Sequence, residues 1–106
     1  MINTEFILKS TGGKLLSGNA GTEFQGISID SRRVKKNDLF IAIKGDNHDG
    51  HDFISEAFKN GAAGAIIDKT PKYSNEYNTK NIIKVSSTTT ALGKVANAWR
   101  NNFPKL

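Results

Sequence analysis

The sequence contains no cysteine, which excludes a disulfide framework and a zinc site built on thiolates. A reducing, cytosolic setting is therefore compatible with the chain. No apolar run approaches the roughly 18 residues of a membrane span, and the start of the chain lacks the charged and apolar segments of a signal peptide. From these absences we expect a soluble protein that does not contact membranes.

A basic stripe with interleaved aromatic side chains, typical of nucleic-acid binding, is also missing. The formal net charge is +5, which favours anionic partners, but the basic residues are scattered. Their densest group, Arg32, Arg33, Lys35 and Lys36, is typical of a solvated turn. We expect no nucleic-acid partner.

The chain also lacks a phosphate-binding P-loop, which requires GxxxxGK followed by Ser or Thr. Gly13-Lys14 is followed by Leu15, Gly93-Lys94 is followed by Val95, and neither pair has the earlier glycine. No ATP site is therefore predicted in these residues.

Apolar periodicity predicts strands that alternate with helices, so we expect one α/β domain. A helix begins at Asn3 or Thr4 and ends at Gly12-Gly13, a second carries Phe53, Ile54, Ala57 and Phe58 and ends at Gly61, and a third begins within Ser86 to Thr88 and carries Leu92, Val95, Ala96 and Trp99. The predicted strands are 14–17, 24–30, 38–43, 64–67 and 82–85, and residues 68–81 are a polar loop. The nearly unbroken apolar run 38–43 predicts a strand covered on both faces.

The stretch KGDNHDGHDF, residues 44–53, raises the possibility of a metal site. An EF-hand calcium loop aligned on Gly50 would place Gly45 at the first ligand position, where a carboxylate is needed. Zinc would need a third ligand besides His48 and His51. No metal site is therefore predicted.

The same stretch is better explained as a turn that starts a helix. Asp49 is a favourable capping residue, and Asp52 three positions later matches a capping box. A helix that begins near Gly50 would point unpaired N–H groups at the preceding turn, where they could hold a phosphate or a polar base edge. A dyad of catalytic carboxylates stays open as an alternative.

A second candidate is Asp30-Ser31-Arg32, at the end of a predicted strand. Ligands of open α/β sheets lie beyond the carboxyl ends of strands, where a Ser hydroxyl and an Arg fork can meet a diphosphate. An ordinary Asx or Ser turn explains the same three residues.

In their order along the chain, these segments resemble the N-terminal domain of the Mur ligases, the cytoplasmic ATP-dependent enzymes that build the peptide of the bacterial cell-wall precursor. The resemblance rests on Asp30-Ser31-Arg32, Val34, Asp38 to Gly45, Asp49 to Ile54, Ala57 and Gly61-Ala62-Ala63, and it extends to the last helix through Thr90 to Gly93 and Trp99-Arg100. One departure is Lys36-Asn37-Asp38, where relatives usually have Pro-Gly-Asp. Asn tolerates the left-handed conformation, so we expect the turn to survive.

The resemblance implies a small three-layer domain, residues 1–106, with a mixed β-sheet flanked by helices. In the family this domain binds the UDP end of the substrate, and separate central and C-terminal domains bind ATP and the incoming amine. The residues that match the family's nucleotide pocket are Ser31, Arg32, Lys44, Gly45, Asp49, Gly50 and His51. No cofactor or metal is implied here, whereas the complete enzyme would need ATP and Mg²⁺.

Within the family the chain most resembles the MurF type, which adds D-alanyl-D-alanine to UDP-N-acetylmuramoyl-tripeptide. Ala91-Leu92-Gly93 and Trp99-Arg100 favour this type, and the MurE type, which adds the third amino acid, is the alternative. We expect a cytoplasmic monomer without catalytic activity of its own. Alternatives of another class are a basic nucleic-acid-binding module and a structural docking domain.

Overall fold

In a computed structural model of the chain, residues 2–69 and 79–102 are described. The helices are α1 (Thr4–Thr11), α2 (Ile54–Lys59) and α3 (Thr88–Asn102), with short 3₁₀ turns η1 (Ser31–Arg33) and η2 (Gly50–Phe53). The strands are β1 (Ile2–Asn3), β2 (Lys14–Ser17), β3 (Glu23–Phe24), β4 (Ile27–Ser28), β5 (Leu39–Ile41), β6 (Gly64–Ile67) and β7 (Asn81–Lys84).

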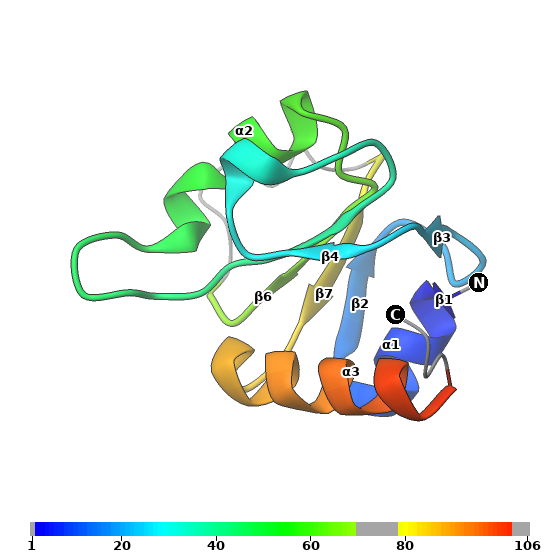
Figure 1. Ribbon diagram of the computed structural model, residues 1–106. Coiled ribbons are helices and arrows are strands. Elements are labelled where there is room, and N and C mark those ends of the chain that lie inside the picture. Colours follow the sequence, from blue (N-terminus) through cyan, green and yellow to red (C-terminus); the bar gives the residue numbers. More distant parts are fainter. Residues whose placement is uncertain (1, 70–78, 103–106) are drawn as a thin grey trace.

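Five strands form one mixed sheet in the order β2-β7-β6-β5-β4, in which β4 to β7 run parallel and β2 pairs antiparallel to β7. Helices α1 and α3 cover one face of this sheet and α2 covers the other (Figure 1). The predicted three-layer α/β fold with a mixed sheet is therefore confirmed. Strand β1 pairs with β3 in a separate two-stranded ribbon that was not predicted.

The sheet separates two apolar cores because successive side chains of a strand point to opposite faces. In β5, Leu39 and Ile41 pack toward α1 and α3, whereas Phe40 packs toward α2. Ile66 and Ile67 divide in the same way in β6. Burial on both faces explains why these strands read as unbroken apolar runs.

The boundaries of α1 and the turn before β5 confirm the predicted capping chemistry. Asn3 Oδ1 accepts a hydrogen bond from the Phe6 backbone N–H at 2.9 Å, and Gly12 ends α1 in the left-handed conformation with φ of 71°. Asn37 also has a positive φ, 69°. The left-handed turn expected at this position is therefore formed with Asn.

Two strand predictions were wrong in extent. The strand expected over 24–30 is broken at Gln25 and Gly26, because β3 pairs with β1 while β4 joins the main sheet. The strand expected over 38–43 is paired as β5 only from Leu39 to Ile41.

The second helix begins later than expected, since η2 occupies Gly50–Phe53 and α2 starts at Ile54. The glycine predicted to end it, Gly61, has a positive φ of 115°. Strand β7 begins at Asn81, and most of the polar loop expected over 68–81 lies outside the described residues.

Candidate functional site

Beyond the carboxyl ends of β4 and β5 lies a hollow of about 530 Å³, which we call the Ser31 hollow. Its walls come from η1, from the chain that follows β5 and from η2. The lining residues are Ile29, Asp30, Ser31, Arg32, Phe40, Ile43, Gly45, His48, Gly50 and Phe53. This is the position at which open α/β sheets bind ligands.

The guanidinium of Arg32 stands at the rim of this hollow. Asp30 caps η1, and its carboxylate accepts hydrogen bonds from the Arg32 backbone N–H at 3.0 Å and from Arg32 Nε and Nη2 at 3.1 Å each. The side-chain hydrogen bond from Arg32 and the backbone one lower the pKa of Asp30, and the same carboxylate raises the pKa of Arg32. The Arg32 side chain is 82% exposed and keeps N–H donors that can meet an anion.

Ser31, the first residue of η1, is buried against α2. Its Oγ donates a hydrogen bond of 2.7 Å to Glu56 Oε1. Its carbonyl oxygen accepts a hydrogen bond of 2.8 Å from Asn60 Nδ2. Two side chains of the α2 region therefore fix the position of Ser31.

Asp49 and His51 form a second polar group, which anchors the start of η2. Asp49 Oδ1 accepts from the His51 backbone N–H at 3.0 Å and lies 2.7 Å from His51 Nδ1, while Lys69 Nζ lies 2.6 Å from Asp49 Oδ2. Burial raises the pKa of Asp49, but the hydrogen bonds from Lys69 and His51 outweigh burial and hold this pKa far below its usual range. Asp49 therefore caps the turn as predicted. The bond that it accepts comes from His51, not from Asp52 as in the predicted capping box.

His51 links this turn to the end of β6. Its Nε2 accepts a hydrogen bond of 3.1 Å from the Asp68 backbone N–H, which assigns the proton of the neutral ring to Nδ1, facing Asp49. Asp68 Oδ2 in turn accepts from the backbone N–H of Thr88 at 3.0 Å and from its hydroxyl at 3.1 Å. The start of η2 and the start of α3 are thus connected through one chain of hydrogen bonds.

The structure brings four of the seven predicted site residues to the Ser31 hollow: Ser31, Arg32, Gly45 and Gly50. The other three, Lys44, Asp49 and His51, are not among its lining residues. The backbones of Lys44 and Asp49 pair across the turn as an isolated antiparallel β-bridge.

The apolar lining of this hollow was not predicted. Ile29 is 53% exposed, although the sequence placed it in a half-buried strand. His48 and Phe53 meet edge to face, with their ring centroids 6.0 Å apart. The apolar residues were visible in the segments after β4 and β5. Their spacing did not indicate that the two segments would line the same hollow.

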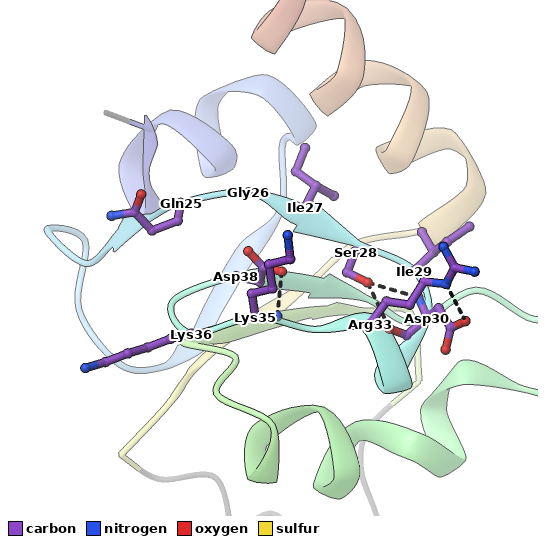
Figure 2. A pocket seen from close by; sticks show the side chains of 10 residues that line it. All are labelled: Gln25, Gly26, Ile27, Ser28, Ile29, Asp30, Arg33, Lys35, Lys36 and Asp38. Carbon is purple, nitrogen blue, oxygen red and sulfur yellow. Dashed lines mark hydrogen bonds and ion pairs between the residues drawn. The ribbon is translucent and has the colours of Figure 1, made fainter. Parts of the chain in front are cut away.

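A larger hollow of about 710 Å³ lies beside β4, at the edge of the sheet (Figure 2). Its basic side chains are Arg33, Lys35 and Lys36, and Figure 2 shows Lys36 extending outward. Asp38 Oδ2, at its floor, already accepts a hydrogen bond of 2.9 Å from the Lys35 backbone N–H. None of the seven predicted site residues lines this hollow.

The described residues 2–69 and 79–102 contain no group of three or more His, Cys, Asp or Glu side chains placed to hold a metal ion. No helix within them is long and apolar enough to cross a membrane.

Comparison with known proteins places this fold in a family. The pattern described as "Mur ligase family, catalytic domain" matches residues 23–100. The UDP-N-acetylmuramoyl-L-alanyl-D-glutamate--2,6-diaminopimelate ligase of Clostridium tetani is 38% identical over 96 residues, 91% of this chain and 20% of that protein. The UDP-N-acetylmuramoyl-tripeptide--D-alanyl-D-alanine ligase of Treponema pallidum is 34% identical over 101 residues, 90% of this chain and 22% of that protein.

The chain belongs to the Mur ligase family, as its resemblance implied. A crystal structure of MurF from Acinetobacter baumannii superposes with a TM-score of 0.80 at 24% identity, over 94% of this chain and 21% of that one, which supports the fold. The chain spans about one fifth of the length of these relatives.

Proposed function

We propose that this chain is the substrate-binding domain of a cytoplasmic Mur ligase and holds the UDP end of a UDP-N-acetylmuramoyl-peptide. The observation that carries the proposal is the Ser31 hollow, where Ser31 and Arg32 of one predicted segment and Gly45 and Gly50 of the other line a single space. These segments lie apart in the sequence, and they follow two neighbouring parallel strands.

The chemistry of the hollow suits a nucleoside diphosphate. Arg32 offers a charged fork for phosphate oxygens, and Ile29, Phe40 and Phe53 offer apolar surface for a flat base. Gly50 lets η2 pack directly against the backbone that follows β5, because a Cβ there would lie 2.7 Å from the Ile43 nitrogen. In this arrangement Asp49 and His51 act by holding the turn in place.

The complete enzyme would use ATP and Mg²⁺, bound outside these 106 residues, to activate the terminal carboxylate of the substrate for attack by an amine. The present domain contributes to that reaction by binding and orienting the substrate. We propose that the isolated domain is monomeric and catalytically inactive, and that it binds neither nucleic acid nor membranes.

For the type of ligase we propose MurF, which adds D-alanyl-D-alanine to UDP-N-acetylmuramoyl-tripeptide. Ala91-Leu92-Gly93 and Trp99-Arg100 support this choice. A MurE-type ligase is the second candidate, favoured by the 38% identity to a 2,6-diaminopimelate ligase. An assay of the complete gene product with each acceptor peptide and each amine separates them, because only the correct pair produces ADP.

The binding proposal is tested by titrating the ¹⁵N-labelled chain with UDP and following its amide resonances. We expect millimolar UDP to shift the signals of Ser31, Arg32 and Gly50. Gln25 and Lys36, at the hollow beside β4, provide an internal control and should stay in place. Unchanged signals at all three residues of the Ser31 hollow, or equal changes at both hollows, would overturn the proposal.

A further inference from the structure

The Ser31 hydroxyl has only one proton, and it donates this proton in a hydrogen bond to Glu56. The Oγ of Ser31 donates to Glu56 Oε1 at 2.7 Å, and a carboxylate can only accept. The Ser31 oxygen retains a lone pair, so it can accept one further hydrogen bond. Toward a ligand in the hollow, Ser31 is therefore an acceptor and not a donor.

Burial and a second hydrogen bond hold Ser31 in the position from which it donates to Glu56. Ser31 is only 6% exposed, so its hydroxyl has little freedom to turn to water. Asn60, which ends the helix that carries Glu56, donates to the Ser31 carbonyl oxygen at 2.8 Å. The residue is thus fixed at both its backbone and its side chain.

An acceptor at this position disfavours phosphate. Phosphate oxygens are themselves acceptors, and the negative charge of Glu56 directly behind the hydroxyl opposes a second anion. The sequence-based expectation that the Ser31 hydroxyl and the Arg32 fork both meet a diphosphate therefore fits only Arg32. The N–H and O–H groups of a nucleoside are the donors that suit Ser31.

We infer that Glu56 is a positioning residue: it makes Ser31 a hydrogen-bond acceptor for an N–H or O–H group of the uridine part of the ligand, while Arg32 receives the diphosphate. This inference rests on the proposed function. Its consequence is selectivity, because Glu56 favours the nucleoside over a bare phosphate.

The test compares the 106-residue chain with its Glu56→Ala and Glu56→Gln variants, using UDP, uridine and inorganic pyrophosphate as ligands. Glu5→Ala, which removes an exposed carboxylate on α1, is the matched control. Affinities come from amide shifts, and the readout is the ratio of pyrophosphate Kd to UDP Kd. The remote resonances of β2 report whether each variant keeps its fold.

In Glu56→Ala the Ser31 hydroxyl loses its hydrogen-bond acceptor and can donate to a ligand. The negative charge of Glu56, which repels anions, is also removed. We expect UDP and uridine to bind roughly threefold to tenfold more weakly, while pyrophosphate binds equally well or better, so the ratio falls. Gln retains an oxygen that accepts the Ser31 hydrogen bond, so Glu56→Gln should keep the UDP and uridine affinities within about twofold of the unaltered chain. Gln has no charge, so its pyrophosphate affinity should change as in Glu56→Ala. Glu5→Ala should change neither affinity.

Three results would overturn the inference. An equal loss of UDP and pyrophosphate in Glu56→Ala would show that Glu56 only stabilises the fold. Unchanged affinities for both ligands in Glu56→Ala would show that the Ser31 proton plays no part in selection. A Gln variant that loses as much uridine affinity as the Ala variant would show that charge, and not the acceptor oxygen, matters. By contrast, an unaltered chain that binds neither UDP nor uridine would refute the proposed function itself.

Discussion

Replacing Asp49 tests whether this residue holds the turn or contacts a ligand. Its carboxylate caps η2, meets the His51 ring at 2.7 Å and pairs with Lys69 at 2.6 Å. Asp49→Ala removes all three interactions. Asp49→Asn keeps a side-chain oxygen that can cap the turn, but it loses the ion pair.

The structure gives the size of the expected loss. A helix-capping side chain contributes about 1 kcal/mol, and a hydrogen bond to a charged group contributes about 1.5 to 3 kcal/mol. The latter range applies because the Asp49 and His51 side chains are only 17% and 10% exposed. Lys69 is 54% exposed, so its pair with Asp49 adds less than about 1 kcal/mol. Asp49→Ala should therefore lower the free energy of unfolding by about 3 kcal/mol, and Asp49→Asn by about half as much.

The loss should also depend on pH. Because the pKa of Asp49 is depressed in the folded state, the folded chain binds its proton less readily than the unfolded chain does. The stability that Asp49 contributes is thus present above the ordinary Asp value of 3.8 and is lost as the pH falls below it toward the folded pKa. The gap between the unaltered chain and Asp49→Asn should narrow between pH 7 and pH 3.

Urea unfolding followed by circular dichroism measures both effects. A loss below about 1 kcal/mol for Asp49→Ala at pH 7, or a gap that stays constant down to pH 3, would refute this account of the turn. Under the same account, the folded Asp49→Asn variant still binds UDP with nearly unchanged affinity. A complete loss of binding in a variant whose spectrum shows an intact fold would mean that Asp49 contacts the ligand.

Three further outcomes are expected. Gly64→Ala should destabilise the chain by about 1 to 3 kcal/mol, because its Cβ would lie 2.8 Å from the Asn81 carbonyl oxygen. Gly93→Ala should stabilise the chain by up to about 1 kcal/mol, because a Cβ at this position of α3 meets nothing within 4 Å. Thermal unfolding of both variants checks the opposite signs. Arg32→Ala should weaken UDP binding roughly tenfold at low salt and less at high salt, whereas Arg33→Ala, beside the other hollow, should have a much smaller effect in the same titration. Ile66→Ala should lower the free energy of unfolding by about 2 to 5 kcal/mol in urea, because Ile66 is fully buried under α1 and α3.

The predicted elements agree with the structure where one local signal decides the conformation. Asn3 and Gly12 bound α1 because capping depends on the residue itself. The predicted strand 24–30 failed because its division depends on pairing partners far away in the sequence. Phe24 pairs with Ile2, whereas Ile27 pairs with Leu39. No alternation within the segment can encode such a change of partner.

The candidate site was also predicted only in part. Strand ends followed by polar residues predicted that Ser31 and Gly50 would lie at the same edge of the sheet, since parallel strands bring their carboxyl ends together. Glu56 could not be found in this way. It lies on an exposed helical face with no motif, and its hydrogen bond to Ser31 exists only because α2 packs beside η1.

Asp68 shows how the hollow depends on residues outside it. Its backbone N–H donates a hydrogen bond to the His51 ring, and its carboxylate caps α3 at Thr88. A single residue at the end of β6 therefore fixes both the turn that carries Gly50 and the start of the last helix. The position of Gly50 thus depends on the seating of α3 through three hydrogen-bonded residues, Asp49, His51 and Asp68. Because these groups are hydrogen-bonded within a largely buried network, loss of one leaves its partners unsatisfied. A change at α3 therefore reaches the hollow through polar contacts as well as through the apolar core.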